Sequence, residues 1–156
     1  MRRKEKEITD RNELDQIIQD SLICHLSCCL DNQPYLLPLS FGYDGSAVYF
    51  HTAREGKKIE YLSLNPRVCL AFESEVKLHS DPDLACGWTF HFKSALAYGT
   101  AEELTDPTNR DNAIKQIMLQ YSDGNWEISD KELSRTKLWR VKLDEITGKK
   151  SPANIE

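Results

Sequence analysis

Residues 35–52, YLLPLSFGYDGSAVYFHT, place two apolar runs on either side of a turn signal. The dipeptide Asp44-Gly45 is typical of a tight hairpin, so the runs 35–43 and 47–52 are predicted to pair as antiparallel strands. Pro38 has no N–H to give a neighbouring strand, which predicts that the first run lies at a sheet edge or is irregular there.

The residues on either side of this hairpin continue the strand pattern. Residues 22–30 alternate, which predicts a further strand whose buried face carries Leu22, Cys24, Leu26, Cys28 and Leu30. Other strands are predicted over 67–73, 88–103 and 136–145, and residues 74–87 are predicted to be a loop because they are polar and contain Asp-Pro and Gly. Strands therefore dominate the chain.

Three short helices are predicted between the strands. Asp10 is a good N-cap for the first helix, and the second covers 56–64. The third begins at Asp106-Pro107, where proline suits the first turn. Its buried face is predicted to carry Ile114, Ile117, Met118 and Tyr121. The sequence thus predicts a β-barrel with peripheral helices, as one domain over residues 1–156.

Length, charge and composition exclude several classes of protein. The chain has 156 residues, which suits one domain, and its formal net charge of −5 argues against a nucleic-acid partner. No segment has the apolar length of a membrane-spanning helix, and no signal peptide is evident, so we expect a cytoplasmic location without membrane attachment. The five cysteines are then expected to be free thiols.

Cys24, His25, Cys28 and Cys29 lie close together in sequence and are of the residue types that bind zinc. They contain no Cys-x-x-Cys pair, and they fall on an alternating strand. We interpret the cysteines as small core residues and expect no metal.

The segment His51–Lys58, HTAREGKK, lies between a strand end and a helix start. A helix N-terminus offers unpaired backbone N–H groups, Thr52 offers a hydroxyl, and Lys57 and Lys58 offer positive charge. Gly56 allows a ligand to approach the backbone closely. These features are typical of a phosphate site. The alternative is a solvated basic turn.

Two other segments are weaker candidates. The run 37–42 could present unpaired amides and an apolar edge to a flat aromatic ring, although a strand with a bulge is the alternative. The long strand carries Trp88, His91 and Ser94, and a basic stretch, 147–151, ends the sequence; the alternatives are a core tryptophan and a flexible tail. Serine-hydrolase, Walker and dinucleotide-binding motifs are absent from the sequence.

These segments together resemble one family. The landmarks are Met1–Lys4, Glu7–Asp10, Pro34-Tyr35, Leu37–Tyr43, Tyr49–Ala53, Gly56–Lys58, Asn65–Val68, Ala85–Thr89, Ser94, Tyr98–Glu102 and Ile146–Pro152. In this order they resemble the FMN-binding split-barrel superfamily of pyridoxamine 5′-phosphate oxidase, and within it the 5-nitroimidazole resistance-type branch. The match runs over nearly the whole chain.

The resemblance implies a six-stranded antiparallel split β-barrel and a homodimer with FMN at the interface. It implies that Lys57 and Lys58 hold the phosphate and that His51, Thr52 and Ala53 line the ribityl chain and phosphate. Leu39, Ser40 and Phe41 would lie along the isoalloxazine, and the partner subunit would supply Trp88, Ser94 and Lys150. Gly87 and Lys93 differ from the residues that many relatives have, which leaves the substrate side less defined than the flavin side.

The resemblance favours an FMN-dependent oxidoreductase that reduces small electron-poor molecules such as nitroaromatic compounds. Three alternatives remain open at this point: a flavin-binding module without turnover, a pyridoxamine phosphate oxidase-like enzyme, and a haem-binding barrel with His51 or His91 as ligand. His51 is the one candidate catalytic side chain. If Val48 and Phe50 face the core, strand alternation turns His51 outward, toward the cofactor. The alternative is that His51 only packs against the ribityl chain of the flavin.

Overall fold

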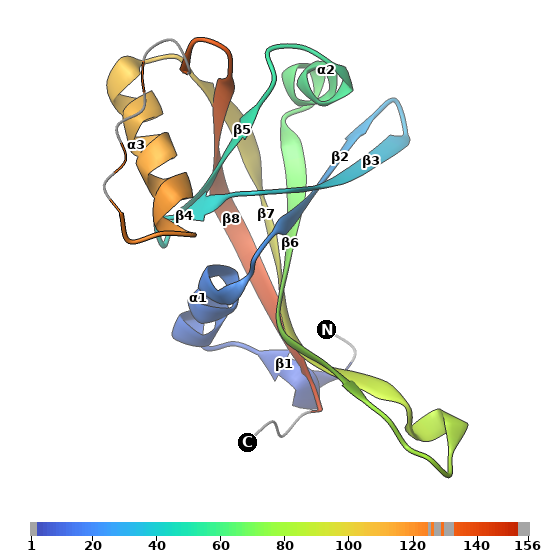
Figure 1. Ribbon diagram of the computed structural model, residues 1–156. Helices are drawn as coiled ribbons and strands as arrows, with labels where there is room; N and C mark the ends of the chain where they lie inside the picture. The colour runs from blue at the N-terminus through green and yellow to red at the C-terminus, as the bar shows by residue number, and fades with distance from the viewer. Residues whose placement is uncertain (1–2, 125, 127–128, 130–132, 153–156) are drawn as a thin grey trace.

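The computed structural model describes residues 3–124, 126, 129 and 133–152. Over these residues the chain forms an eight-stranded antiparallel sheet with three α-helices around it (Figure 1). The strand order is β3-β2-β6-β7-β8-β5-β4, and β1 pairs with β8. The strands are β1 (Glu7–Ile8), β2 (Cys24–Leu30), β3 (Gln33–Leu39), β4 (Gly42–Tyr43), β5 (Ala47–Thr52), β6 (Arg67–His79), β7 (Thr89–Leu104) and β8 (Lys137–Ser151).

The predicted fold class is confirmed. The six strands expected of a split barrel are present as β2, β3, β5, β6, β7 and β8, and the structure adds β1 and β4, which have two residues each. The barrel core is filled by alternating residues of these strands, as strand geometry requires. Two aromatic pairs pack inside this core. Phe41 contacts Phe72 edge-on with 5.2 Å between ring centroids, and Phe50 stacks on Trp139 with 6.3 Å between centroids.

Helices α1 (Arg11–Asp20), α2 (Lys57–Leu64) and α3 (Pro107–Leu119) lie where the sequence predicts them. The carboxylate of Asp10 accepts hydrogen bonds from two backbone N–H groups of the first turn of α1, so the predicted N-cap is confirmed. No helix in the described part of the chain is long and apolar enough to cross a membrane.

Helix α3 covers the face of β5 that points away from the barrel core. Ala113 and Ile117 of α3 form a second, smaller core with Ala47, Tyr49 and Leu138. The predicted buried face of α3 is therefore only partly right, because Ile114 and Met118 are half-buried and the Tyr121 ring is exposed. Leu22 was predicted to face the core but is 78% exposed, because β2 begins two residues later.

The strand predicted over 35–43 is split. Strand β3 ends at Leu39, and β4 begins at Gly42. The intervening Phe41 N–H donates to the hydroxyl of Tyr121, which itself donates to the carbonyl of Leu22. Of the two alternatives predicted from Pro38, the edge strand is the one that the structure shows, because β3 ends the strand order and its pairing with β2 is regular at Pro38.

The prediction of a loop over 74–87 is wrong for residues 74–79. Strand β6 continues to His79 and pairs with β7 as a two-stranded arm that projects away from the barrel (Figure 1). The register shifts between Ser74 and Lys77, where Glu75 has a φ of 54°. Residues 75–79 are all exposed, so the arm has no buried face to produce the alternation from which a strand is read.

The last strand was predicted over 136–145 and is longer in the structure, which also rules out the alternative of a flexible tail over 147–151. Strand β8 continues to Ser151, pairing with β7 on one side and with β1 on the other. Gly148 allows β8 to pack closely against α1 and β1, because a Cβ at this position would lie 2.3 Å from Leu14 Cδ2 and 2.9 Å from Ile8 Cβ. Pairing with the neighbouring strands therefore fixes the backbone positions of the basic residues Lys149 and Lys150.

Candidate functional site

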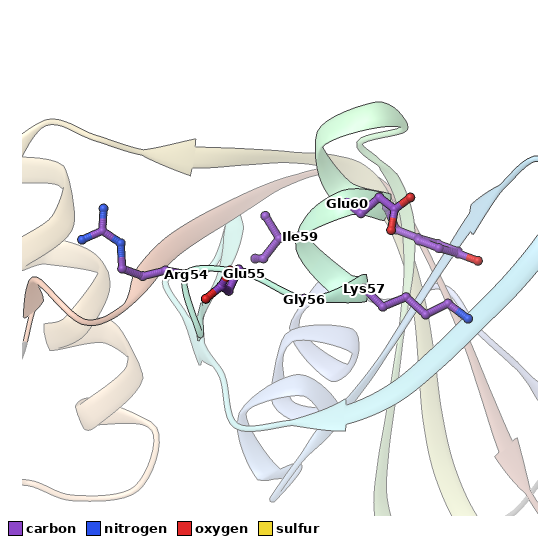
Figure 2. A pocket seen from close by; sticks show the side chains of 7 residues that line it. Arg54, Glu55, Gly56, Lys57, Ile59 and Glu60 are labelled. Carbon is purple, nitrogen blue, oxygen red and sulfur yellow. The ribbon is translucent and has the colours of Figure 1, made fainter.

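The junction of β5 and α2 carries the features predicted for a phosphate site. Gly56 has a φ of 118°, a conformation that glycine adopts without strain, and it stands at the N-cap of α2 without a side-chain cap. The first N–H groups of α2 therefore have no side-chain acceptor from this chain. Residues 54–57 and 59–61 line an open hollow of about 710 Å³ at this helix end (Figure 2).

The two lysines of this junction have different surroundings. Lys57 Nζ lies over the rings of Tyr35 and Tyr61, at 4.9 and 5.2 Å from their centroids. These are cation–π contacts, and the two rings pack 5.4 Å apart. Lys58 is half-buried, and this partial burial lowers the pKa of its ammonium. The Lys57 ammonium is thus held on the β3 side of α2.

His51 is placed as predicted by strand alternation. Val48 and Phe50 are fully buried in the barrel core, whereas His51 is exposed at the end of β5. Partial desolvation by its surroundings and the nearby charge of Lys58 lower the pKa of His51, so the neutral imidazole is favoured. The structure brings His51, Lys58 and the N-terminus of α2 into one neighbourhood.

The hydroxyl of Thr52, predicted as a phosphate donor, makes two hydrogen bonds within the chain. Its side chain is buried, donates to the carbonyl of Ala53 at 2.8 Å and accepts from Trp139 Nε1 at 3.1 Å. The indole and the carbonyl therefore use the hydrogen-bonding capacity of this hydroxyl. Thr52 fixes the strand end, and Ala53 follows it as an exposed residue.

Only part of the segment Leu39–Phe41, which was predicted to lie along the isoalloxazine, is exposed for contact with a ligand. Ser40 is exposed and Leu39 is half-buried, so both can meet a ligand. Phe41 cannot offer its ring, which is fully buried against Phe72, or its N–H, which donates to Tyr121. The Phe41 side chain therefore belongs to the core, and the contact of this segment with the ring system stays a prediction for Leu39, Ser40 and the remaining backbone of Phe41.

Trp88, Ser94 and Lys150 are remote from the α2 site within one chain. Trp88 is 53% exposed at the outer end of the β6–β7 arm, on the opposite side of the molecule from α2 (Figure 1). Ser94 donates weakly to the carbonyl of Lys149 at 3.5 Å, and Lys150 pairs with Glu13 of α1 at 3.6 Å. A single chain therefore does not bring the two halves of the predicted site together.

The sequence reasoning missed Arg54 and the tyrosine pair that positions Lys57. Arg54 leaves the loop in the opposite direction from Lys57 (Figure 2), and it donates to the carbonyl of Ser134 at 2.9 Å. Arg54 stands inside the HTAREGKK segment, and its charge was the available signal. Tyr35 and Tyr61 are far apart in sequence, and no local pattern could have joined them.

Neither the cysteines nor the histidines assemble a metal centre in the described residues. No group of three or more metal-ligating side chains occurs among them. Burial raises the pKa of the Cys24 thiol to about 12, which suits the predicted role of a core residue. His91 stacks on His79 along the arm, with 5.0 Å between centroids, and lies away from His51.

Comparison with known proteins confirms the family. The model of the pyridoxamine 5′-phosphate oxidase family matches residues 10–150, and the chain belongs to that family. An uncharacterised protein of Rhizobium meliloti (strain 1021) is 30% identical over 152 residues, covering 91% of this chain and 93% of that protein.

Solved structures are similar as well. A structure from Bacteroides thetaiotaomicron, provisionally assigned as a 5-nitroimidazole antibiotic resistance protein, has 31% identity and a TM-score of 0.82, covering 92% of this chain and 85% of that one. An FAD and haem binding protein from Mycobacterium smegmatis has 19% identity and a TM-score of 0.82, covering 94% of this chain and 74% of that one. At that lower identity the likeness concerns the fold.

Proposed function

We propose that this protein is an FMN-dependent oxidoreductase that reduces small electron-poor molecules such as nitroaromatic compounds. The observation that carries the proposal is the β5–α2 junction, where an uncapped helix N-terminus, Gly56 and Lys57 border an open hollow and Lys58 follows in the first turn of the helix. Family membership and the FAD named for the Mycobacterium smegmatis neighbour support a flavin cofactor.

The residues present fit a phosphorylated flavin. The first N–H groups of α2 would receive the phosphate, with Lys58 beside them and Lys57 next to Tyr35 and Tyr61. Leu39 and Ser40 would lie along the ring system, and His51 would stand between ring and phosphate. When bound, the flavin supplies the redox chemistry, and the chain's residues bind and orient it.

A homodimer would complete the site. The β6–β7 arm, which carries Trp88, projects on the side of the molecule away from α2 (Figure 1). In a two-fold dimer, the arm of one subunit, with Ser94 and Lys150 at its base, would approach the β5–α2 junction of the other subunit. The arm supports this proposal because it exposes large apolar side chains that a partner would cover. These are Val76, Leu78, Leu84, Trp88 and Phe90.

The cofactor assignment is tested by titrating the protein with FMN and with riboflavin, following quenching of flavin fluorescence. Because riboflavin lacks the phosphate, FMN should bind at least about tenfold more tightly, the value of one charge-assisted contact. Equal affinities would remove the phosphate argument.

Turnover is tested separately from binding. Photoreduced, FMN-loaded protein should be reoxidised faster by a nitroaromatic compound under anaerobic conditions than in buffer alone. Equal traces would favour the second candidate, a flavin-binding module without turnover.

We expect His51→Ala to retain most of the FMN affinity, because the exposed imidazole is not part of the core. The variant should change the rate of reoxidation by the nitro compound. An unchanged rate across the neutral pH range would assign His51 to packing and would leave the flavin as the sole reactive group.

A further inference from the structure

The hydroxyl of Tyr121 joins three segments that are far apart in the sequence. It accepts a hydrogen bond from the backbone N–H of Phe41 at 3.0 Å and donates to the carbonyl of Leu22 at 3.0 Å. Tyr121 lies just after α3, Phe41 lies between β3 and β4, and Leu22 precedes β2. A phenol has one donor hydrogen, which goes to Leu22, and its oxygen accepts from Phe41. One side chain thus links α3 to the β3–β4 junction and to the start of β2.

Neighbouring contacts hold Tyr121 in place. The side-chain amide of Gln120 donates to the carbonyls of Gln19 and Ser21 at 2.7 and 3.2 Å, which ties the end of α3 to the end of α1. The backbone N–H of Tyr121 donates to the carbonyl of Met118 at 3.0 Å. Partial burial raises the pKa of Tyr121, so the phenol keeps its donor hydrogen at neutral pH. The hydroxyl is therefore a permanent hydrogen-bonding group at a fixed position.

The β3–β4 junction is held on both sides of the exposed Ser40. Before it, Leu39 ends β3 and pairs with β2. After it, the Phe41 ring is fully buried, and Gly42 packs so closely on α3 that a Cβ there would lie 2.3 Å from the helix backbone. Without the Tyr121 hydroxyl the Phe41 N–H would lose its hydrogen-bond partner. The backbone next to Ser40 would then be held less firmly.

Strand β3 connects the α2 junction to this segment. Near its start, the Tyr35 ring lies under the ammonium of Lys57, which is 4.9 Å from the ring centroid. Leu39 lies four residues further, roughly 13 Å along a strand at about 3.3 Å per residue. Beyond it the chain enters β4, which lies beside α3 (Figure 1). A ligand with its phosphate on α2 and its ring along β3 would thus bring the ring to Leu39 and Ser40.

We propose that Tyr121 is a positioning residue for the flavin ring, because its hydroxyl fixes the backbone of the Leu39–Phe41 segment along which the isoalloxazine would lie. This inference rests on the proposed flavin site. Tyr121 acts through the Phe41 N–H and needs no contact with the flavin. Removing the hydroxyl frees this N–H and loosens the segment, which alters the surroundings of the ring. The phosphate end of the flavin, at α2, stays unaltered.

The experiment compares Tyr121→Phe with the wild-type chain, with Tyr49→Phe as the matched control. Tyr49 packs against the same helix, and its hydroxyl donates to Asp44 Oδ2 at 2.7 Å from a strand that does not pair with β3. Each protein is titrated with FMN and with riboflavin by flavin fluorescence, the absorption bands of the bound flavin are recorded, and the urea midpoint reports stability.

Tyr121→Phe should weaken FMN and riboflavin by the same factor, about two- to tenfold, which is the value of one neutral hydrogen bond. It should also shift the absorption bands of the bound flavin, because the surroundings of the ring change. Tyr49→Phe should change neither the affinities nor the bands, although it also loses a hydrogen bond.

Wild-type affinities and unshifted bands in Tyr121→Phe would overturn the inference whatever the urea midpoint, because the hydroxyl would then serve only the fold. A loss for FMN alone would also overturn it, since that would place the effect at the phosphate. Equal changes in Tyr49→Phe would do the same, because they would show a general loosening around α3. A wild-type chain that binds neither flavin would overturn the proposed flavin site itself, and this inference with it.

Discussion

Replacing the two lysines of the α2 junction one at a time should separate their contributions to FMN binding. Lys58 is half-buried and its pKa is lowered by that burial, so a bound phosphate would supply a counter-charge that favours the ammonium form. Lys57 already contacts the rings of Tyr35 and Tyr61, and it must share or leave those contacts to reach a phosphate. We therefore expect Lys58→Ala to cost more affinity than Lys57→Ala.

The size of each effect follows from the contacts. A charge-assisted hydrogen bond is worth about 1.5–3 kcal/mol, so Lys58→Ala should weaken FMN about 10- to 150-fold. Cation–π contacts at exposed sites are worth about 0.5–1 kcal/mol, which should make the loss in Lys57→Ala two- to fivefold smaller, by about that energy. The double variant should lose at least as much as Lys58→Ala.

The assay is fluorescence titration of both single variants, the double variant and Lys142→Ala, each with FMN and with riboflavin. Lys142→Ala is the matched control, because it removes the same charge from an exposed residue that does not line the hollow. Riboflavin should bind all four proteins with nearly the wild-type affinity because it has no phosphate. Wild-type FMN affinity in the double variant would refute the phosphate assignment. An equal loss for riboflavin would show that the lysines support the fold and not the phosphate.

Three further predictions address assembly, charge and packing. The protein should be a dimer by light scattering, and a monomer that retains FMN would contradict a shared site. Lys58→Ala should raise the pKa of His51, because it removes a positive neighbour that disfavours the imidazolium; NMR titration of the imidazole checks this, and an unchanged pKa would show that desolvation alone sets it. Gly42→Ala should destabilise the fold by about 1–3 kcal/mol, because the new Cβ would lie 2.3 Å from the backbone of Gln116; an unaltered urea midpoint would contradict this packing.

The parts of the fold that were predicted correctly are those with one buried face. Strand β2 and helix α1 carry apolar residues at the period of their backbone, so the sequence alone indicates which residues are buried. The N-cap Asp10 could also be predicted from local sequence, because its carboxylate accepts hydrogen bonds from N–H groups only two and three residues away.

The errors arise where structure depends on distant partners. Residues 77–79 pair with β7 although both of their faces are exposed, so no periodicity marks them. Residues 146–151 continue β8 because β7 and β1 flank them, and these strands come from remote parts of the chain. The local pattern of apolar and polar residues contains no information on strand pairing between remote segments.

The candidate site was predicted at the level of segments and less well at the level of atoms. The HTAREGKK segment was identified from its helix start, glycine and charges, all of which are local. The sequence did not reveal that Thr52 bonds Trp139, or that Phe41 is buried against Phe72, because both contacts join residues far apart in the chain. Side-chain direction is decided by tertiary packing.

The central claim is that the β5–α2 junction binds a phosphorylated flavin. The visible absorption spectrum of the purified protein, recorded before and after incubation with FMN and removal of the free cofactor, tests it most directly. We predict the two-band spectrum of an oxidised flavin that stays with the protein, at one flavin per chain, and is lost from the Lys57→Ala/Lys58→Ala variant. A Soret band in place of the flavin bands, or a protein that remains colourless after incubation with FMN, would contradict the claim.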